Sequence, residues 1–413
     1  MTSETVPDRR WSTVLDGIRA DALDCFQTTF ALIADRAHGR GAHLALGSRL
    51  AFAVRGHQDG GPTVVASLDD RLADAQDLLG LRVTGRWTGI DGPALRALAD
   101  TSAPLYVVAD AHAMGWVPYA GHEHMAHSFL LSEGGGAPTA VDAYHNDTAY
   151  GPARPGTWRL TEAALDAAVA AGAEVLAVTA GPRPTLDARA SLDVTAGGLR
   201  EAIPEIERYV AAVRAAPVDV AALDRLVLDV WMLARARALH VAWLGSLGTN
   251  PPGLGTAARD WRAQAERWQR LAAQTYLAAR RARRRLEAPD RAIGELERLL
   301  LEDVELAGRS AQLARAASGS ARPGAPDVRR VVLDELRRTF AGAGEDEETG
   351  SSPRPLRDLP GFSSFRLLDV IDRIEARLEV RLDANDLTAD SLRDAGTLSA
   401  LFAGAARAGA RQS

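Results

Sequence analysis

Residues 187–316 follow an amphipathic helical pattern almost throughout, and this block constrains the fold more than any other part of the chain. It holds two long runs, "LDRLVLDVWMLARARALHVAWLG" and "AARDWRAQAERWQRLAAQTYLAARRARRRLE", separated by the turn-forming segment "GTNPPGLG". A helix with one apolar stripe has to bury that stripe against other elements. We therefore expect an all-helical region here, and a chain of 413 residues leaves room for further domains around it.

The preceding region, residues 1–186, mixes helical and strand periods. The segment "DCFQTTFALIADRAHG" carries apolar side chains at helical spacing, and Gly39 is suited to end that helix. Four apolar runs read as strands: "PLYVVAD", "HSFLLSE", "APTAVDAY" and "EVLAVTA". The predicted fold class is therefore α+β, with the all-helical region of residues 187–316 as its partner.

A linker and a compact tail come after the helical region. Residues 317–327, "ASGSARPGAPD", are small residues and prolines typical of a linker. Residues 328–413 contain two amphipathic helical patterns, "DVRRVVLDELRRTFAG" and "SSFRLLDVIDRIEARLEV", and two shorter ones around "TADSLRDAG" and "TLSALFAGAARA". The tail is expected to fold as a four-helix bundle.

Charge and hydropathy narrow the class of protein. The net charge of −6 gives no reason to expect nucleic acid as a partner. The sequence has no apolar run close to the roughly 20 residues that span a membrane, and "MTSETVPDRRWSTVLDG" lacks the apolar stretch of a signal peptide. We therefore expect no membrane association and a cytoplasmic location. The single cysteine excludes an intramolecular disulfide.

Ser364 opens the second long helical pattern of the tail. The stretch "LPGFSSFRLLDVIDRIEARLEVRL" resembles an acyl carrier protein, in helix order, in the long first loop and in the serine at this position. The resemblance implies that Ser364 carries covalent 4′-phosphopantetheine, and a phosphodiester at a helix start is favoured by the helix dipole. The family usually has Asp-Ser-Leu where this chain has Ser363-Ser364-Phe365. The alternative is a serine that only caps a helix of a plain four-helix bundle.

Cys25 lies in the first turn of the helix that begins near Asp24. Free amide groups and the helix dipole stabilise a thiolate at such a position, and the thiolate is the nucleophilic form of cysteine. The alternative is a buried structural cysteine, because free cysteines are among the most buried residues.

The segment "GHEHMAHSFLLSEGGGAPTAVDAY" places three histidines before a glycine-rich turn and an aspartate after it. If Gly134 and Gly135 form a two-residue hairpin loop, His127 falls directly opposite Asp142, on the same face of the sheet. That pair would be a general base and the carboxylate that orients it. The alternative is a zinc site, because His122, His124 and His127 together with Asp142 are possible ligands.

Residues 23–158 resemble the N-terminal papain-like domain of the acyltransferase from butirosin antibiotic biosynthesis. The resemblance rests on Cys25 at a helix start, on "HLALGSRLAFAVR", and on "YVVADAHAMGWVPY" ahead of the histidine hairpin. The order Cys, His, Asp also matches papain-type bacteriocin-leader peptidases. The resemblance implies that Cys25 is the nucleophile, His127 the base and Asp142 the orienting residue. The helical region, with Trp261 and Trp268, is similar to the partner domain of that family.

Two further side chains are candidates near this site. The amide of Cys25 is the expected oxyanion donor, because a helix start supplies it, and Gln27 is a candidate side-chain donor. Tyr119 is a candidate pocket residue. The predicted site contains no metal.

Together these features predict a papain-like cysteine-peptidase-type domain, a helical partner region and an acyl carrier domain. The expected activity is acyl transfer in natural-product biosynthesis, from a phosphopantetheine thioester through an acyl-cysteine to an amine or hydroxyl acceptor. The expected partners are an acyl or aminoacyl thioester donor, the small-molecule acceptor, a phosphopantetheinyl transferase and an acyl-loading ligase. The alternatives are a carrier-linked thioesterase with the same triad, and a non-catalytic carrier scaffold.

Overall fold

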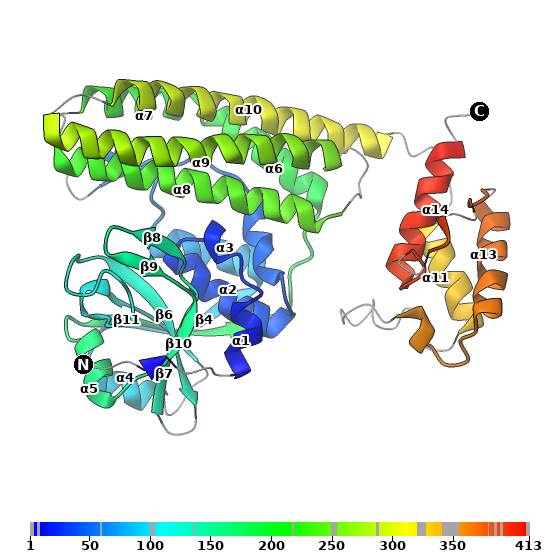
Figure 1. The fold of residues 1–413 in the computed structure, drawn as a ribbon, viewed down its shortest axis with the longest axis horizontal. Coiled ribbons are helices and arrows are strands. Elements are labelled where there is room, and N and C mark those ends of the chain that lie inside the picture. Colours follow the sequence, from blue (N-terminus) through cyan, green and yellow to red (C-terminus); the bar gives the residue numbers. More distant parts are fainter. Residues whose placement is uncertain are drawn as a thin grey trace. The chain divides into compact units, whose positions relative to one another are not determined.

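The computed structural model describes most of the chain, in two compact units (Figure 1), Met1–Gly319 and Ser320–Ser413. The predicted regions 1–186 and 187–316 both fall inside the first unit. The residues outside the description are 1–3, 6–8, 58–59, 100–103, 135–136, 217–218, 249–253, 286–288, 320–327, 341–354, 379, 384–385, 389–390 and 410–413.

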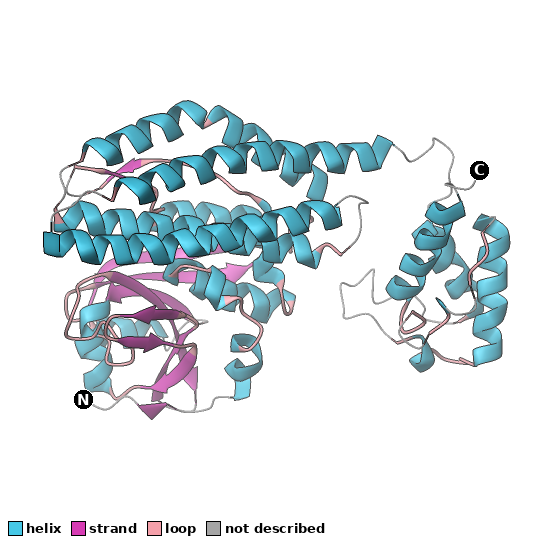
Figure 2. Cartoon of the chain, turned by 45° about the horizontal axis from the view of Figure 1, so that its top comes forward, coloured by secondary structure: helices cyan, strands magenta, loops and turns pink. Residues whose placement is uncertain are grey.

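The first unit is built around an antiparallel sheet of seven strands in the order β1-β10-β7-β6-β5-β11-β4. Four of these strands are the predicted ones, so the α+β class is confirmed. Figure 2 shows the sheet with helices packed around it. The strands are β1 (Glu4–Thr5), β4 (Leu81–Ile90), β5 (Leu105–Asp110), β6 (Ala126–Gly134), β7 (Ala137–Asp142), β10 (Gly156–Arg159) and β11 (Ala173–Ala180). Two small hairpins accompany the sheet, β2 (Arg55–Gly56) with β3 (Pro62–Thr63), and β8 (Asn146–Thr148) with β9 (Gly151–Ala153).

Helices cover both faces of the sheet. Successive strand residues point to opposite faces, so apolar side chains on each face are buried by helices. On one face the Phe30 ring of α2 stacks on Tyr106 of β5, with ring centroids 4.5 Å apart. On the other face Leu95 and Leu165, from α4 and α5, share a core with Phe129 of β6. The helical elements around the sheet are α1 (Arg9–Leu15), η1 (Ala20–Ala22), α2 (Cys25–His38), η2 (Ala42–Ser48), α3 (Leu68–Leu79), α4 (Gly92–Ala99), η3 (Ala111–Ala113) and α5 (Glu162–Ala168).

The long helices of the first unit pack as a bundle around a core that contains the buried indoles of Trp261 and Trp268. Arg237 and Asp303 form an ion pair of 2.8 Å inside this bundle, and Trp268 donates to the same carboxylate. No helix in the described part of the chain is long and apolar enough to cross a membrane. The helices are α6 (Ala188–Glu201), α7 (Ile203–Ala215), α8 (Val220–Ser246), α9 (Leu254–Arg285) and α10 (Asp290–Gly319).

Helix α8 joins the bundle to the sheet, and Figure 1 shows it on the side of the bundle that faces the sheet. It packs on η2, where Gly47 permits an unusually close approach. A Cβ at Gly47 would lie 2.4 Å from the carbonyl oxygen of Leu239, so another residue there would force the backbones apart. The imidazole of His240 donates from Nδ1 to the Gly47 carbonyl over 2.7 Å. Helix α8 is thus held by close backbone contact to η2, one of the helical elements around the sheet.

The helical region ends three residues later than the predicted boundary at residue 316. Helix α10 continues to Gly319, so residues 317–319 are helical where a linker is expected. The helical period of "AQLARAASG" extends past the first small residues, and alanine favours helix. Residues 320–327 lie outside the described residues.

The second unit has its own apolar core, formed by residues such as Val332, Phe340, Ile374 and Phe402. Its described helical elements are α11 (Val328–Thr339), η4 (Leu356–Asp358), α13 (Ser364–Leu378) and α14 (Ala395–Gly409). Residues 391–394, part of the predicted short helix at "TADSLRDAG", form turns and bends instead.

A buried carboxylate links two helices of this second unit. Glu335 of α11 is 1% exposed and accepts hydrogen bonds from Arg338, Arg373 and Arg377. Burial acts to raise the pKa of Glu335, but the hydrogen bonds and charges of these arginines outweigh burial and leave the pKa below its ordinary value. Glu335 therefore stays charged and ties α11 to α13.

Candidate active site

Cys25 is the first residue of α2, and a capping box fixes the helix start. The carboxylate of Asp24 accepts from the Gln27 amide over 2.8 Å, while the Gln27 side-chain oxygen accepts from the Asp24 amide over 3.2 Å. This exchange satisfies two of the free donors at the helix end. The position of the Cys25 backbone at the helix start is thereby fixed.

Arg71 of α3 forms an ion pair with Asp24, whose negative charge lies beside the thiol. Arg71 Nη2 lies 2.6 Å from the second carboxylate oxygen of Asp24, and both side chains are largely buried. A buried carboxylate without a partner would be costly. The ion pair lets an aspartate cap the helix that carries the cysteine.

Side-chain hydrogen bonds connect the first turn of α2 to strand β6. Ser128 donates to the carbonyl of Cys25 over 2.7 Å, and the Thr28 hydroxyl donates to the same oxygen over 2.7 Å. The hydroxyls of Thr29 and Ser128 lie 2.8 Å apart. Tyr106 of β5 donates to the carbonyl of Phe26 over 3.2 Å. The two hydrogen bonds of Ser128 attach the first turn of α2 to the strand that carries His127.

The structure corrects the register predicted for the hairpin of β6 and β7. Gly134 pairs with Ala137 and Leu130 with Val141, so Asp142 aligns with Phe129 and not with His127. The prediction placed the turn one residue too early, which displaces every pair by two residues. A two-residue shift preserves the face of each side chain. His127 and Asp142 therefore remain on the same face, as diagonal neighbours.

The predicted contact between His127 and Asp142 is present. The His127 Nε2 and Asp142 Oδ2 atoms are 2.8 Å apart, with the two residues 1% and 3% exposed. Trp116 donates to the same oxygen over 3.3 Å, and the Tyr144 amide donates to the other oxygen over 2.9 Å. The Tyr144 ring packs edge-on against the imidazole, with centroids 5.2 Å apart. The carboxylate and the imidazole are thus held in one relative orientation.

The sulfur of Cys25 lies beside this pair. Its Sγ atom is 3.9 Å from the carbonyl oxygen of Ala126, the residue before His127. Burial acts to lower the pKa of His127. The charge and hydrogen bond of Asp142 and the hydrogen bond of Cys25 outweigh burial, and they raise the pKa to about 10. His127 is therefore an imidazolium at neutral pH.

The other histidines of the cluster do not converge with His127. The ring of His122 stacks on Tyr150, with centroids 4.3 Å apart. His124 contacts the carboxylate of Asp110 over 2.5 Å and stacks on His112. Within the described part of the chain, no group of three or more His, Cys, Asp or Glu side chains is placed to hold a metal ion. The arrangement of the described residues gives the zinc alternative no support.

The two remaining candidate residues, Gln27 and Tyr119, both form hydrogen bonds with neighbouring residues of the fold. The Gln27 side-chain oxygen is engaged in the capping box of α2, and its role as an oxyanion donor stays a prediction. Tyr119 is buried, with its hydroxyl 3.5 Å from that of Tyr144 and 3.2 Å from the side-chain nitrogen of Asn146. Tyr119 therefore contacts Tyr144, the residue whose ring packs on His127, and its role in a substrate pocket stays a prediction.

Ser364 is the exposed first residue of α13, as the sequence predicts. The cap of this helix is formed by its neighbour: the hydroxyl of Ser363 accepts from the Arg366 amide over 3.2 Å. The side chain of Phe365 is 81% exposed beside it. The Ser364 hydroxyl is therefore accessible and is not needed to cap the helix, which fits a residue that carries a phosphodiester-linked arm.

Sequence reasoning missed two residues that hold this site together. Ser128 sits in an apolar strand without a motif, and its contact with Cys25 spans 103 residues of sequence. Arg235 of α8 donates to the carbonyl of Leu23, two residues before Cys25, and to the carbonyl of His145, three residues after Asp142. It is one arginine among many in a chain whose basic residues other than histidine are all arginine. Neither residue carries a local pattern that would have identified it.

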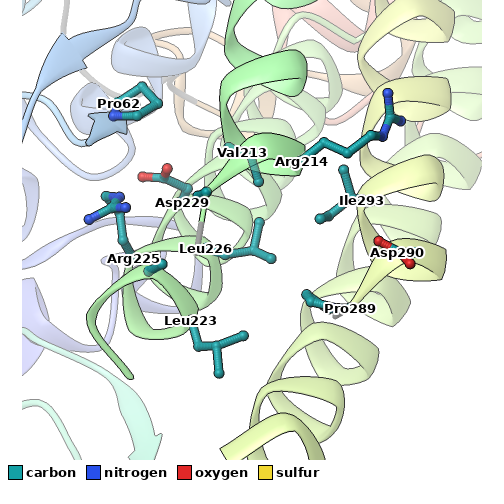
Figure 3. A pocket seen from close by; sticks show the side chains of 12 residues that line it. Pro62, Val213, Arg214, Leu223, Arg225, Leu226, Asp229, Pro289, Asp290 and Ile293 are labelled. Carbon is teal, nitrogen blue, oxygen red and sulfur yellow. The ribbon is translucent and has the colours of Figure 1, made fainter. Parts of the chain in front are cut away.

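A separate small cavity lies among α7, α8 and α10 (Figure 3), with a volume of about 40 Å³. The Asp229 carboxylate on its wall is already bonded, to the hydroxyls of Thr63 and Tyr209 over 2.6 and 2.7 Å. Ligand pockets usually measure roughly 300–1,000 Å³. The cavity is too small for such a ligand, and the carboxylate of Asp229 on its wall already has hydrogen-bond partners.

No protein-family model matches the chain, and no curated protein sequence matches it. The geometry of the cysteine, histidine and aspartate site therefore carries the functional assignment.

Proposed function

We propose that this protein is a cysteine-dependent acyltransferase with a papain-like first unit and an acyl carrier protein as its second unit. The observation that carries the proposal is the convergence of three groups. The Cys25 sulfur at the start of α2 lies 3.9 Å from the carbonyl oxygen of Ala126, the residue before His127, and the His127 imidazole is paired with a buried carboxylate over 2.8 Å. Nucleophile, base and orienting residue in this order are the parts of covalent acyl transfer.

The first half-reaction uses the thiolate of Cys25 and the imidazolium of His127. The thiolate attacks the carbonyl carbon of an acyl thioester donor, and the Cys25 amide at the helix start is suited to bind the oxyanion. When the carbon–sulfur bond to the donor breaks, the departing thiolate takes the proton of His127. The products are an acyl-cysteine and a free donor thiol, and Asp142 keeps the ring in place throughout.

The second half-reaction restores the resting site. An amine or hydroxyl acceptor attacks the acyl-cysteine while the neutral His127 removes its proton. The bond between the acyl carbon and the Cys25 sulfur then breaks, which regenerates the thiolate and the imidazolium. Water in place of the acceptor would give a thioesterase, so the nature of the released product distinguishes the two reactions.

The second unit contains Ser364, the residue to which the proposed acyl donor would be attached. Ser364 is exposed at the start of α13, with its neighbour Ser363 serving as the cap. A phosphopantetheine arm on Ser364 supplies a thiol that holds the acyl group as a thioester. Tethering the donor to the transferase in one chain raises its effective concentration at the site.

Intact-protein mass spectrometry tests both parts. Coenzyme A and a phosphopantetheinyl transferase should add one arm to wild type and to Ser363→Ala, but none to Ser364→Ala. With an acyl-loaded arm and a panel of amines and alcohols, Cys25→Ala should discharge about 10⁴-fold more slowly than wild type or not at all.

Three outcomes of this experiment are decisive. Equal discharge by wild type and Cys25→Ala would overturn the transferase assignment. Release only as free acid would identify a thioesterase. Failure to load Ser364, with Ser363→Ala loaded no better, would remove the carrier assignment and leave the cysteine site to be tested with free thioesters.

A further inference from the structure

A single side chain of the helical bundle reaches the segment that leads to the nucleophile. Arg235 of α8 donates from Nη1 to the carbonyl of Ala20 over 2.8 Å and to the carbonyl of Leu23 over 2.5 Å. Leu23 lies two residues before Cys25. Hydrogen bonds from a charged donor to a carbonyl are stronger than neutral ones, so Arg235 fixes the chain entering α2.

The other end of the guanidinium reaches the segment just after Asp142. Arg235 donates from Nη2 to the carbonyl of His145. The guanidinium carbon also lies 6.0 Å from the ring centroid of Tyr144, whose amide bonds Asp142 and whose ring packs on His127. One planar group therefore bonds the backbone on both the nucleophile side and the carboxylate side of the site.

The guanidinium is itself held in place from α8. It lies 4.1 Å from the ring centroid of Trp231, one helical turn earlier. Trp231 packs against the same apolar cluster as Cys25, Trp116 and Met125. The carboxylates of Asp21 and Asp24 are close enough for their charges to act on Arg235. Stacking, charge and three carbonyl acceptors thus define one position for this side chain.

We propose that Arg235 is a positioning residue for the reaction of Cys25, which makes helix α8 part of the active site. The proposal rests on the proposed function. Arg235 bonds backbone carbonyls on both flanks of the site, and it acts by keeping the sulfur of Cys25 within reach of His127. A displacement of about 1 Å at a reacting group can lower a rate on the order of 10²-fold.

The test uses the full chain and iodoacetamide as probe, because Cys25 is its only cysteine and no acyl substrate is needed. The rate of Cys25 alkylation is measured from pH 4 to pH 10 by mass spectrometry for wild type, Arg235→Ala, Arg235→Lys and Leu233→Ala. Leu233 is a buried core residue of the same helix and serves as the matched control. Tryptophan fluorescence melts report the stability of each variant.

We expect Arg235→Ala and Leu233→Ala both to lower the melting temperature. Only Arg235→Ala should move the rise of alkylation to higher pH, with a roughly tenfold lower rate near pH 6 for each pH unit of displacement. Arg235→Lys should restore part of the rate, because lysine keeps the charge but lacks the planar fork.

Two results would overturn the positioning role: an unchanged pH profile in Arg235→Ala, or an equal displacement in Leu233→Ala. A wild-type profile that rises near pH 8.5, as for a free thiol, would count against the proposed function itself. If wild type is activated and Arg235→Ala is not, but neither transfers an acyl group, the positioning role stands and the transfer assignment fails.

Discussion

At the scale of single residues, the central feature of the site is the positive charge on the buried imidazole of His127. His127 is 1% exposed, and burial alone would keep its imidazole neutral. The adjacent Asp142 carboxylate reverses this, and the pKa of His127 rises to about 10. The protein thus keeps a proton on a buried imidazole at neutral pH, and the proposed acyl transfer would use that proton.

This stored proton couples folding stability to pH. The pKa of His127 is about 10 in the folded chain and roughly 6.5 in an unfolded one. The folded state therefore holds more protons between these values, and stability falls as the pH rises from neutral through 10. We expect the free energy of unfolding to decrease more steeply with pH in wild type than in Asp142→Asn, where this proton is already lost at neutral pH.

Urea unfolding followed by tryptophan fluorescence measures this difference. All eight tryptophans precede residue 320, so the signal reports the first unit alone. Parallel curves for the two proteins between pH 7 and pH 10.5 would contradict the prediction, because the remaining titrating groups are the same in both.

At the scale of elements, two helices with the same type of cap offer a comparison. Asp24 and Gln27 form the capping box of α2, and Ser67 and Asp70 form that of α3. Loss of a capping residue costs about 0.5–2 kcal/mol. The two helices differ in their first turn, because only α2 presents a reactive side chain there.

We expect Asp24→Ala and Ser67→Ala both to reduce stability by about 1 kcal/mol or more, with the larger loss in Asp24→Ala because Arg71 then loses its buried partner. Only Asp24→Ala should slow the alkylation of Cys25 at pH 6. The two variants are compared by urea unfolding and by alkylation rate. An equal effect of both variants on the alkylation rate would show that the cap of α2 has no special bearing on the thiol.

The strands and their contacts show which structural features local sequence patterns predict and which they miss. Strands β5, β6 and β7 are predicted because their apolar runs are buried, but β4, "LRVTGRWTGI", is an edge strand with mostly exposed side chains and carries no such run. The contact of His127 with Asp142 is predicted despite the wrong register, because a shift of two residues keeps both side chains on one face. Arg235 and Ser128 act across more than 100 residues of sequence, and local patterns hold no information on such contacts.

At the scale of the whole molecule, the sheet and the bundle belong to one compact unit, Met1–Gly319. Gly47 and His240 bring η2 and α8 into backbone contact, and Arg235 enters the site from α8. Burial lowers the pKa of His240 to about 4, so the imidazole at this junction is neutral and packs without a charge.

A fragment of residues 1–186 should therefore fail to fold cooperatively, because it exposes the surface that α8 covers. Residues 1–319 should melt at the same temperature as the full chain when tryptophan fluorescence is followed. Four of the tryptophans, Trp11, Trp87, Trp116 and Trp158, are present in the shorter fragment and report on its state. A sharp melt of residues 1–186 would contradict this prediction.

The adjacent serines of the second unit have different surroundings, because Ser363 accepts a hydrogen bond at the helix start and Ser364 is exposed. Since the Ser363 hydroxyl caps the start of α13 and the Ser364 hydroxyl is left to solvent, chemistry on the second does not disturb the first. If Ser364 carries the proposed arm, attaching and removing that arm should leave the stability of the second unit unchanged, because the hydroxyl that caps α13 belongs to the neighbouring residue.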